Sequence, residues 1–86
     1  MNYTIPSTVF IQEVDDEVII LDTNTQEYFS INEVGKDIWE HISKNTPKDK
    51  LIEELSTKYE VPKEQLEVDI QNFCEALEQK GLIKKD

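Results

Sequence analysis

The sequence contains no arginine, and this absence argues against nucleic-acid binding. All nine basic residues are lysines, against 19 acidic residues, so the 86-residue chain has a formal net charge of −10. Nucleic-acid-binding proteins use lysine and arginine on phosphates, and arginine above all for bidentate contacts to bases. So acidic a surface repels phosphate and favours a neutral or basic partner. We therefore expect no nucleic-acid partner, although solubility alone also explains such a charge.

Cysteine, histidine and glycine are scarce, with one, one and two residues respectively. Zinc sites need several Cys or His ligands, and phosphate-binding loops need several glycines. We interpret His41, which lies beside an apolar helix face, as a structural residue. Cys74 has Glu75 and Glu78 nearby and lies on an apolar stripe, so its pKa should be raised and its thiol inert. We expect no catalytic residue, no metal and no cofactor, and hence no enzyme.

Long apolar runs are absent as well, since no stretch approaches the 18 residues or so that a membrane span requires. Residues 1–4 lack the basic and then apolar pattern of a signal peptide. A single cysteine cannot form an internal disulfide, which fits a reducing compartment. We expect one cytoplasmic domain over residues 1–86, with no membrane partner.

Hydrophobic periodicity predicts an α+β fold of the winged helix-turn-helix-like type, with a three-stranded antiparallel sheet followed by three helices. The strands are expected over 7–14, 17–22 and 26–31, and the helices over 32–43, 47–59 and 62–80. Residues 18–21 form a continuous apolar run, typical of a central strand covered on both faces. Residues 1–6 are expected to be a polar, frayed lead-in.

Short sequence signals mark the helix ends. Asn32 is a good N-cap, and Thr46 followed by Pro47 offers an N-cap and a proline at the first helical position. Gly81 suits the C′ position after the third helix. Gly35 costs the first helix up to about 1 kcal/mol relative to Ala. We therefore expect another backbone to approach Gly35 closely.

The third predicted strand lacks the residues that normally discourage pairing at a sheet edge. Residues 26–31 contain no Pro, Lys or Gly. In one interpretation another strand or a terminal segment covers this edge. In the other, the edge is left open as a docking site for an extended peptide.

The order and spacing of these motifs resemble the PqqD family, the recognition elements of ribosomally synthesised and post-translationally modified peptides (RiPPs). The resemblance covers residues 8–83 and rests on Leu21-Asp22, Tyr28-Phe29-Ser30-Ile31-Asn32, Val34-Gly35, Ile38-Trp39, Leu55, Tyr59-Glu60-Val61, Asp69-Ile70, Phe73, Leu77 and Gly81-Leu82-Ile83. Within the family, the form LD…YF.IN.VG..IW is most similar to the stand-alone B1 proteins of lasso peptide clusters.

This resemblance implies that the chain binds the leader of a precursor peptide, as an extra strand beside the third strand and in a cleft to the third helix. It also implies delivery to a leader peptidase in lasso peptide biosynthesis. The implied peptide-binding residues are Glu27, Tyr28, Phe29, Ser30 and Ile31 on the strand, and Asp69, Asn72, Phe73 and Ala76 on the helix. Strand alternation places Tyr28 and Ser30 on one face and Phe29 and Ile31 on the other. One pair should enter the core and the other should line the cleft.

Two alternatives stay open at this point. The partner enzyme could be another modifying enzyme, such as a radical SAM enzyme in a different RiPP or quinone-cofactor pathway. The chain could instead be an acidic winged-helix regulatory protein that acts through protein contacts. A monomer or a weak dimer is expected in each case, because a free strand edge permits self-pairing.

Overall fold

The computed structural model describes residues 3–86, in which eight helices and strands follow one another with short connections. They are β1 (Tyr3–Thr4), β2 (Val9–Val14), β3 (Glu17–Asp22), β4 (Tyr28–Ile31), α1 (Glu33–Ser43), α2 (Lys48–Tyr59), α3 (Lys63–Gln79) and β5 (Lys84–Lys85). The predicted α+β class and the order of three strands and three helices are confirmed. The short strands β1 and β5 are additions to that order.

The main sheet is an antiparallel meander in the order β2-β3-β4, so the apolar strand β3 is central as predicted. The β3–β4 turn is closed by the carboxylate of Asp22, which accepts a hydrogen bond of 2.8 Å from the N–H of Asn24. Such local side-chain to backbone bonds favour turns over continued strands. Asp15 in the β2–β3 turn and Gln26 in the β3–β4 turn have positive φ angles of 55° and 64°.

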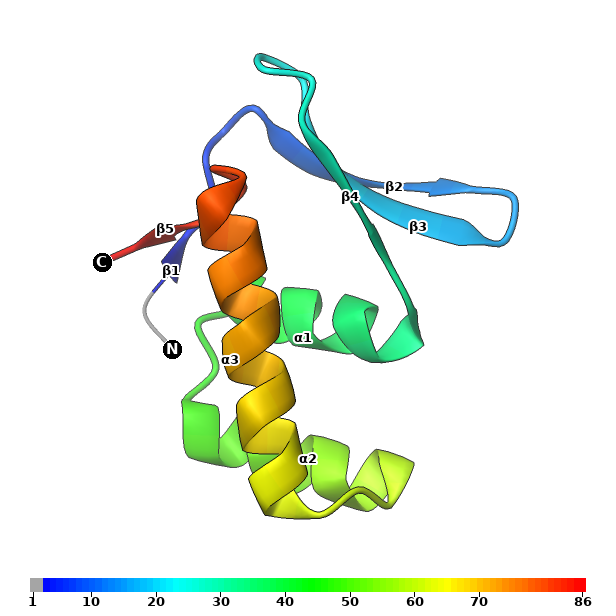
Figure 1. Cartoon of the computed structure of the whole chain (residues 1–86), viewed down its shortest axis with the longest axis vertical. Helices are drawn as coiled ribbons and strands as arrows, with labels where there is room; N and C mark the ends of the chain where they lie inside the picture. Colours follow the sequence, from blue (N-terminus) through cyan, green and yellow to red (C-terminus); the bar gives the residue numbers. More distant parts are fainter. Residues whose placement is uncertain (1–2) are drawn as a thin grey trace.

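Within residues 3–86 only one face of the main sheet is covered, and the three helices lie on that side (Figure 1). On this inner face Val9 and Ile20 are buried. On the outer face Ile19 and Leu21 are only half-buried, and Phe10 is exposed. The expectation that residues 18–21 are covered on both faces is therefore wrong, because no described element packs on the outer side.

The helices begin close to the predicted positions. Asn32 caps α1, with its side-chain oxygen accepting from the N–H of Gly35 at 2.8 Å. In α2 the N-cap is Pro47 itself, and helical structure starts one residue later than expected. The predicted cap by Thr46 is wrong because its hydroxyl pairs instead with Nδ1 of His41 at 2.9 Å. Likewise Pro62 precedes α3 as its N-cap.

The core is built from one face of each helix and the inner face of the sheet. Its most buried members include Ile20, Ile38, Trp39, Ile42, Leu51, Leu55, Leu66, Ile70, Leu77 and Leu82. Helix α3 ends in a Schellman turn, as Gly81 predicted. The N–H of Gly81 donates to the carbonyl of Glu78, and the N–H of Leu82 donates to the carbonyl of Leu77, each at 3.0 Å. Gly81 has φ of +74°, a conformation that suits glycine.

The two ends of the described chain pair with each other rather than with the main sheet. β1 and β5 form a separate antiparallel ribbon in which Tyr3 is opposite Lys85 and Thr4 opposite Lys84. The hydroxyl of Thr4 donates to the carboxylate of Asp86 at 2.6 Å. The prediction of a frayed lead-in is therefore wrong for residues 3–6, while residues 1–2 lie outside the described part. Figure 1 shows this ribbon beside the upper half of α3.

Candidate functional site

The outer edge of β4 is open. Among residues 3–86, β4 pairs only with β3, and the terminal strands pair with each other instead. The interpretation that a terminal segment covers this edge is therefore excluded for the described part of the chain. An open edge of this kind offers unpaired main-chain groups to an incoming extended segment.

Backbone geometry indicates which groups of β4 face outward. The N–H of Asp22 donates to the carbonyl of Glu27 at 2.9 Å, so these opposite residues form a hydrogen-bonded pair. Hydrogen-bonded and non-bonded pairs alternate along an antiparallel ladder. With the observed register, Phe29 therefore turns its backbone groups toward β3. The N–H and C=O groups of Tyr28 and Ser30 point away from β3, toward the open edge.

The side chains of β4 also alternate between the two faces of the sheet, as predicted. Phe29 and Ile31 are half-buried and pack against the core, whereas Tyr28 is 61% exposed and Ser30 is exposed. The prediction that one pair enters the core is confirmed by Phe29 and Ile31, and lining of a peptide cleft by the other pair stays a prediction. The pair that enters the core also faces α3, and Tyr28 and Ser30 lie on the outer face of the sheet.

One stripe of α3 faces β4. The ring of Phe73 meets the ring of Phe29 edge-on, with centroids 5.9 Å apart and an interplanar angle of 80°. Two turns further along, Nζ of Lys80 is 3.6 Å from a carboxylate oxygen of Glu27. Residues between these two contacts at helical spacing share the stripe, so half-buried Ala76 belongs to it.

The stripe continues from Phe73 toward the start of α3. Asp69 and Asn72 precede Phe73 by four and one residues, and both are exposed. A carboxylate oxygen of Asp69 accepts a hydrogen bond of 2.9 Å from the side chain of Gln65. The structure therefore places all four predicted helix residues on or beside the stripe, while contact with a peptide stays a prediction.

Gly35 of α1 holds β4 and α3 close together. A Cβ atom at this position would lie 3.0 Å from Cβ of Ile31 and 3.3 Å from Cε1 of Phe73. The predicted close approach is present, but the neighbours are side chains and not another backbone. Because both neighbours belong to the β4 and α3 surfaces described above, Gly35 helps to set the distance between them.

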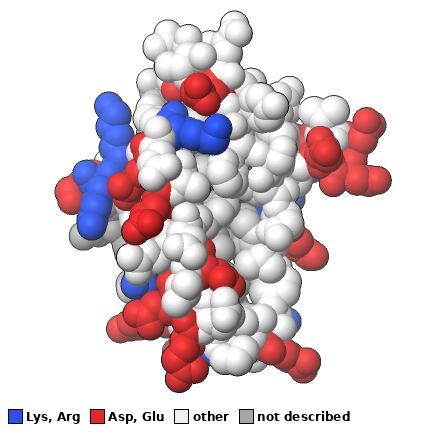
Figure 2. Space-filling model, in the orientation of Figure 1, with Lys and Arg blue, Asp and Glu red and all other residues white. Residues whose placement is uncertain are grey.

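The surface between β4 and α3 is mostly uncharged. Figure 2 shows a pale central region between acidic groups at the tip of the β2–β3 hairpin, on the right, and acidic groups over the lower part of the helices. The acidic residues of the hairpin tip are Asp15, Asp16 and Glu17, all exposed. Where β4 and α3 meet, the half-buried rings of Phe29 and Phe73 are in contact.

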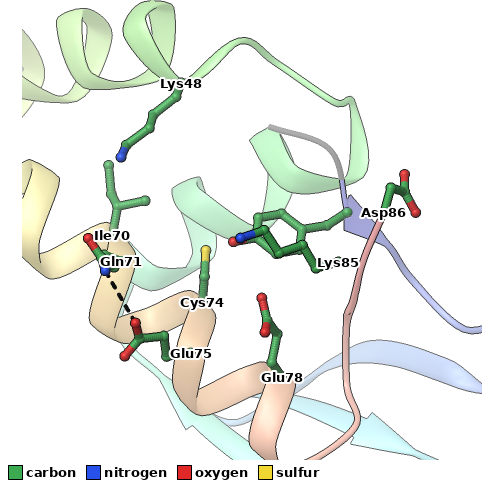
Figure 3. A pocket seen from close by; sticks show the side chains of 9 residues that line it. Lys48, Ile70, Gln71, Cys74, Glu75, Glu78, Lys85 and Asp86 are labelled. Atoms are coloured by element: carbon green, nitrogen blue, oxygen red, sulfur yellow. Dashed lines mark hydrogen bonds between the residues drawn. The ribbon is translucent and has the colours of Figure 1, made fainter.

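A pocket of about 540 Å³ lies on a different face of α3, next to the β1–β5 ribbon (Figure 3). Burial raises the pKa of the Cys74 thiol, which lies in this pocket's wall. Burial, together with Cys74 and Glu78, raises the pKa of Tyr3 to about 12. Both groups are thus held in their protonated forms at neutral pH, and a protonated thiol is a poor nucleophile. The expectation of a raised Cys74 pKa is confirmed.

His41 has the structural role predicted for it. Its Nδ1 pairs with the hydroxyl of Thr46, and its Nε2 lies 3.1 Å from a carboxylate oxygen of Glu54 on α2. Within residues 3–86, His, Cys, Asp and Glu form no group of three or more suited to a metal ion. In the same part of the chain no helix has the length and apolar character needed to cross a membrane.

A second open edge, on β2, was not identified from the sequence. β2 pairs only with β3 among the described residues. Thr23 donates to the carbonyl of Thr8 at 2.9 Å, so alternation directs the backbone groups of Ile11 and Glu13 away from β3. Residues 9–14 contain no Pro, Lys or Gly. The criterion that indicated the β4 edge would have indicated this one too.

Comparison with known proteins places this arrangement in a defined group. The model of the family described as "Coenzyme PQQ synthesis protein D (PqqD)" matches residues 17–83. A solved structure described as "TbiB1 in Complex with the TbiA(beta) Leader Peptide" is similar, with a TM-score of 0.80 and 29% identity over 96% of this chain and 94% of that chain. No curated protein sequence matches closely enough to count as a relative.

A second solved structure extends the likeness in fold. It is described as "Lasso peptide synthetase B1 complexed with the leader peptide" and has a TM-score of 0.86 and 19% identity, covering 96% of this chain and 98% of that chain. At this identity the similarity concerns the fold alone. Both solved structures are thus nearly coextensive with this chain.

Proposed function

This chain belongs to the PqqD family of non-catalytic peptide-recognition domains, and from that premise we propose that it binds the leader of a ribosomally made precursor peptide along the open edge of β4. The leader adds as a fourth strand of the main sheet and rests against the stripe of α3. The domain then delivers the precursor to a leader peptidase in lasso peptide biosynthesis.

The observation that carries this proposal is the open β4 edge, which lies beside the contact between Phe29 and Phe73. Tyr28 and Ser30 offer main-chain groups to a guest strand, while Phe29 and Phe73 supply apolar surface beside it. A preordered edge lowers the cost of ordering on binding, because only the guest has to become extended. The similarity to the structure solved with the TbiA(beta) leader peptide supports the same interpretation.

The family alone also accommodates a modifying enzyme of another pathway as the recipient, such as a radical SAM enzyme. We favour the leader peptidase because the form LD…YF.IN.VG..IW in this sequence resembles the stand-alone B1 proteins of lasso peptide clusters. Cleavage of the cognate precursor by its peptidase should be faster in the presence of this protein, and an unchanged rate would favour the other class of recipient.

A proline substitution tests strand addition directly. Ser30→Pro removes an N–H that points to the open edge, and it should weaken binding of the cognate leader at least tenfold, because about 1.4 kcal/mol is a typical net value for one or two such bonds. Isothermal titration of the synthetic leader measures this. Ile11→Pro is the matched control, since it removes an outward N–H from the other edge.

The two variants must first show similar unfolding transitions by circular dichroism. Equal leader affinity for Ser30→Pro and wild type would contradict pairing at β4. A tenfold loss for Ile11→Pro with none for Ser30→Pro would place the leader on β2.

A further inference from the structure

The outer face of the main sheet carries a concentration of exposed apolar side chains. Five large apolar residues in the described chain are exposed. Phe10, Val14 and Tyr28 lie on this outer face, while Ile11 is opposite Ile20 on the inner face and Val68 is on α3. Exposed apolar residues scattered singly need no explanation, but contiguous ones mark interaction surfaces.

The strand register places exposed and half-buried apolar residues next to one another on the outer face. Phe10, Leu21 and Tyr28 are opposite one another on β2, β3 and β4, so they form one row across the outer face. Ile19 and Val14 lie on the same face further along the hairpin. We call these five residues the outer-face patch. It borders the second open edge, on β2, and the helices lie on the opposite side of the sheet (Figure 1).

The patch is also continuous with the proposed leader site. A guest strand beside β4 sends alternate side chains to the outer face, next to Tyr28. A protein that covers the patch would therefore touch this domain and its bound leader together. The β2 edge stays free when the β4 edge is occupied, so both partners fit at once.

Charge selects the kind of partner. Asp15, Asp16 and Glu17 border the patch at the hairpin tip, and the whole chain has a charge of −10. A second copy would bring a surface of the same sign to this face, which disfavours association. A partner with an apolar centre and a rim of Lys and Arg complements it.

We propose that the outer-face patch and the β2 edge are the docking surface for the enzyme that processes the precursor. This inference rests on the proposed leader-binding function. It assigns the two edges of one small sheet to two partners, with the leader on β4 and the enzyme on β2 and the adjoining face.

The test uses the purified leader peptidase of the same biosynthetic system and the leader peptide as separate probes. Phe10→Ser and Val14→Ser should each weaken peptidase binding roughly tenfold, the effect expected of apolar residues central to an interface, and leave leader affinity unchanged. Val68→Ser is the matched control, because Val68 is 54% exposed and Val14 51%. Its peptidase affinity should equal that of wild type.

A second arm tests the charge argument. The double variant Asp15→Asn, Asp16→Asn should slow association with the peptidase several-fold at low ionic strength, and the difference should shrink as salt is added. Surface plasmon resonance at two salt concentrations measures this. An unchanged association rate would contradict the inference that the partner has a rim of Lys and Arg.

The outcomes separate this inference from the proposed function. If wild type binds no leader, the proposed function fails. If wild type binds leader but not the peptidase, or if Phe10→Ser and Val14→Ser bind the peptidase as well as Val68→Ser does, the docking surface is overturned. It is also overturned if sedimentation shows a wild-type dimer that these two variants dissociate, because the occupant is then a second copy.

Discussion

The two edge strands of the main sheet both lack Pro, Lys and Gly, but they have very different support. β4 is backed by helices: Phe29 meets Phe73, Ile31 packs beside Gly35, and Glu27 lies near Lys80. In β2 the only buried side chain is that of Val9. Further along the inner face of β2, Glu13 forms an ion pair with Lys36 of α1.

Figure 1 shows the β2–β3 hairpin reaching past the helices at its tip. The two open edges of this small sheet therefore differ in how much of the domain packs behind them. Side chains of the helices pack behind β4, whereas β2 has only the Glu13–Lys36 ion pair beyond Val9. The sequence signal of an open edge does not distinguish them, because the difference lies in what packs behind the strand.

A matched pair of phenylalanines gives the largest expected contrast between the edges. Phe29→Ala should lower the free energy of unfolding by about 2 kcal/mol, less than for a fully buried Phe because Phe29 is half-buried. Phe10→Ala should cost less than about 1 kcal/mol because Phe10 is 56% exposed. Urea unfolding measures both, and equal losses would contradict the difference in backing.

Substitution of Gly35 tests how closely α1 packs against β4 and α3. Helix propensity alone predicts that Gly35→Ala stabilises α1 by up to about 1 kcal/mol. The Cβ contact of 3.0 Å with Ile31 should reverse the sign, giving a loss of about 1 kcal/mol and weaker leader binding. Denaturant unfolding and leader titration measure the two effects.

Gly81→Ala is the control for this variant. No atom lies within 4 Å of its added Cβ, but its φ is +74°, so it should cost about 1 kcal/mol through backbone strain alone. Leader affinity should not change. A stabilised Gly35→Ala variant would show that β4 can move away from α3 at no cost.

The smallest effect concerns the turn that leads into β4. Hydrogen bonds from the N–H of Asn24 and from Thr8 lower the pKa of Asp22. The ionised form is therefore favoured in the folded state, and its stabilising contribution is complete above the ordinary carboxyl pKa of about 4. This contribution is lost as the pH falls below that value and through the lowered folded pKa.

Unfolding experiments on wild type and Asp22→Asn at several pH values check this expectation. The wild type should be more stable near pH 7, and the difference should shrink on acidification. A difference that is constant with pH would show that the carboxylate charge is not what stabilises this turn.

Much of the fold could be predicted because local signals and long-range packing agree there. Asn32 and Gly81 have the predicted cap roles, since capping depends on a few neighbouring residues. The β1–β5 ribbon could not be predicted, because two-residue strands have no periodicity and their pairing depends on the Schellman turn after α3. The Thr46 cap was wrong because the competing partner, His41, is supplied by another helix.

The candidate site could be predicted only in part. The absence of Pro, Lys and Gly indicated the open β4 edge, and the family resemblance implied the site residues Asp69, Asn72, Phe73 and Ala76 on α3. The face of the sheet that Phe29 would occupy depends on where the helices pack, which strand alternation does not specify. For the same reason the apolar run of β3 suggested cover on both faces, although no described helix or strand packs on the outer face.

The ribbon of β1 and β5 makes the domain nearly a closed loop of chain, because Thr4 and Lys84 are paired neighbours. A linker of a few residues would suffice to join the two ends, and new ends could be opened at the exposed Asp15-Asp16 tip, where termini are well tolerated. For the same reason the whole unit could be inserted into a surface loop of another protein through two adjacent attachment points, with the edge of β4 still accessible.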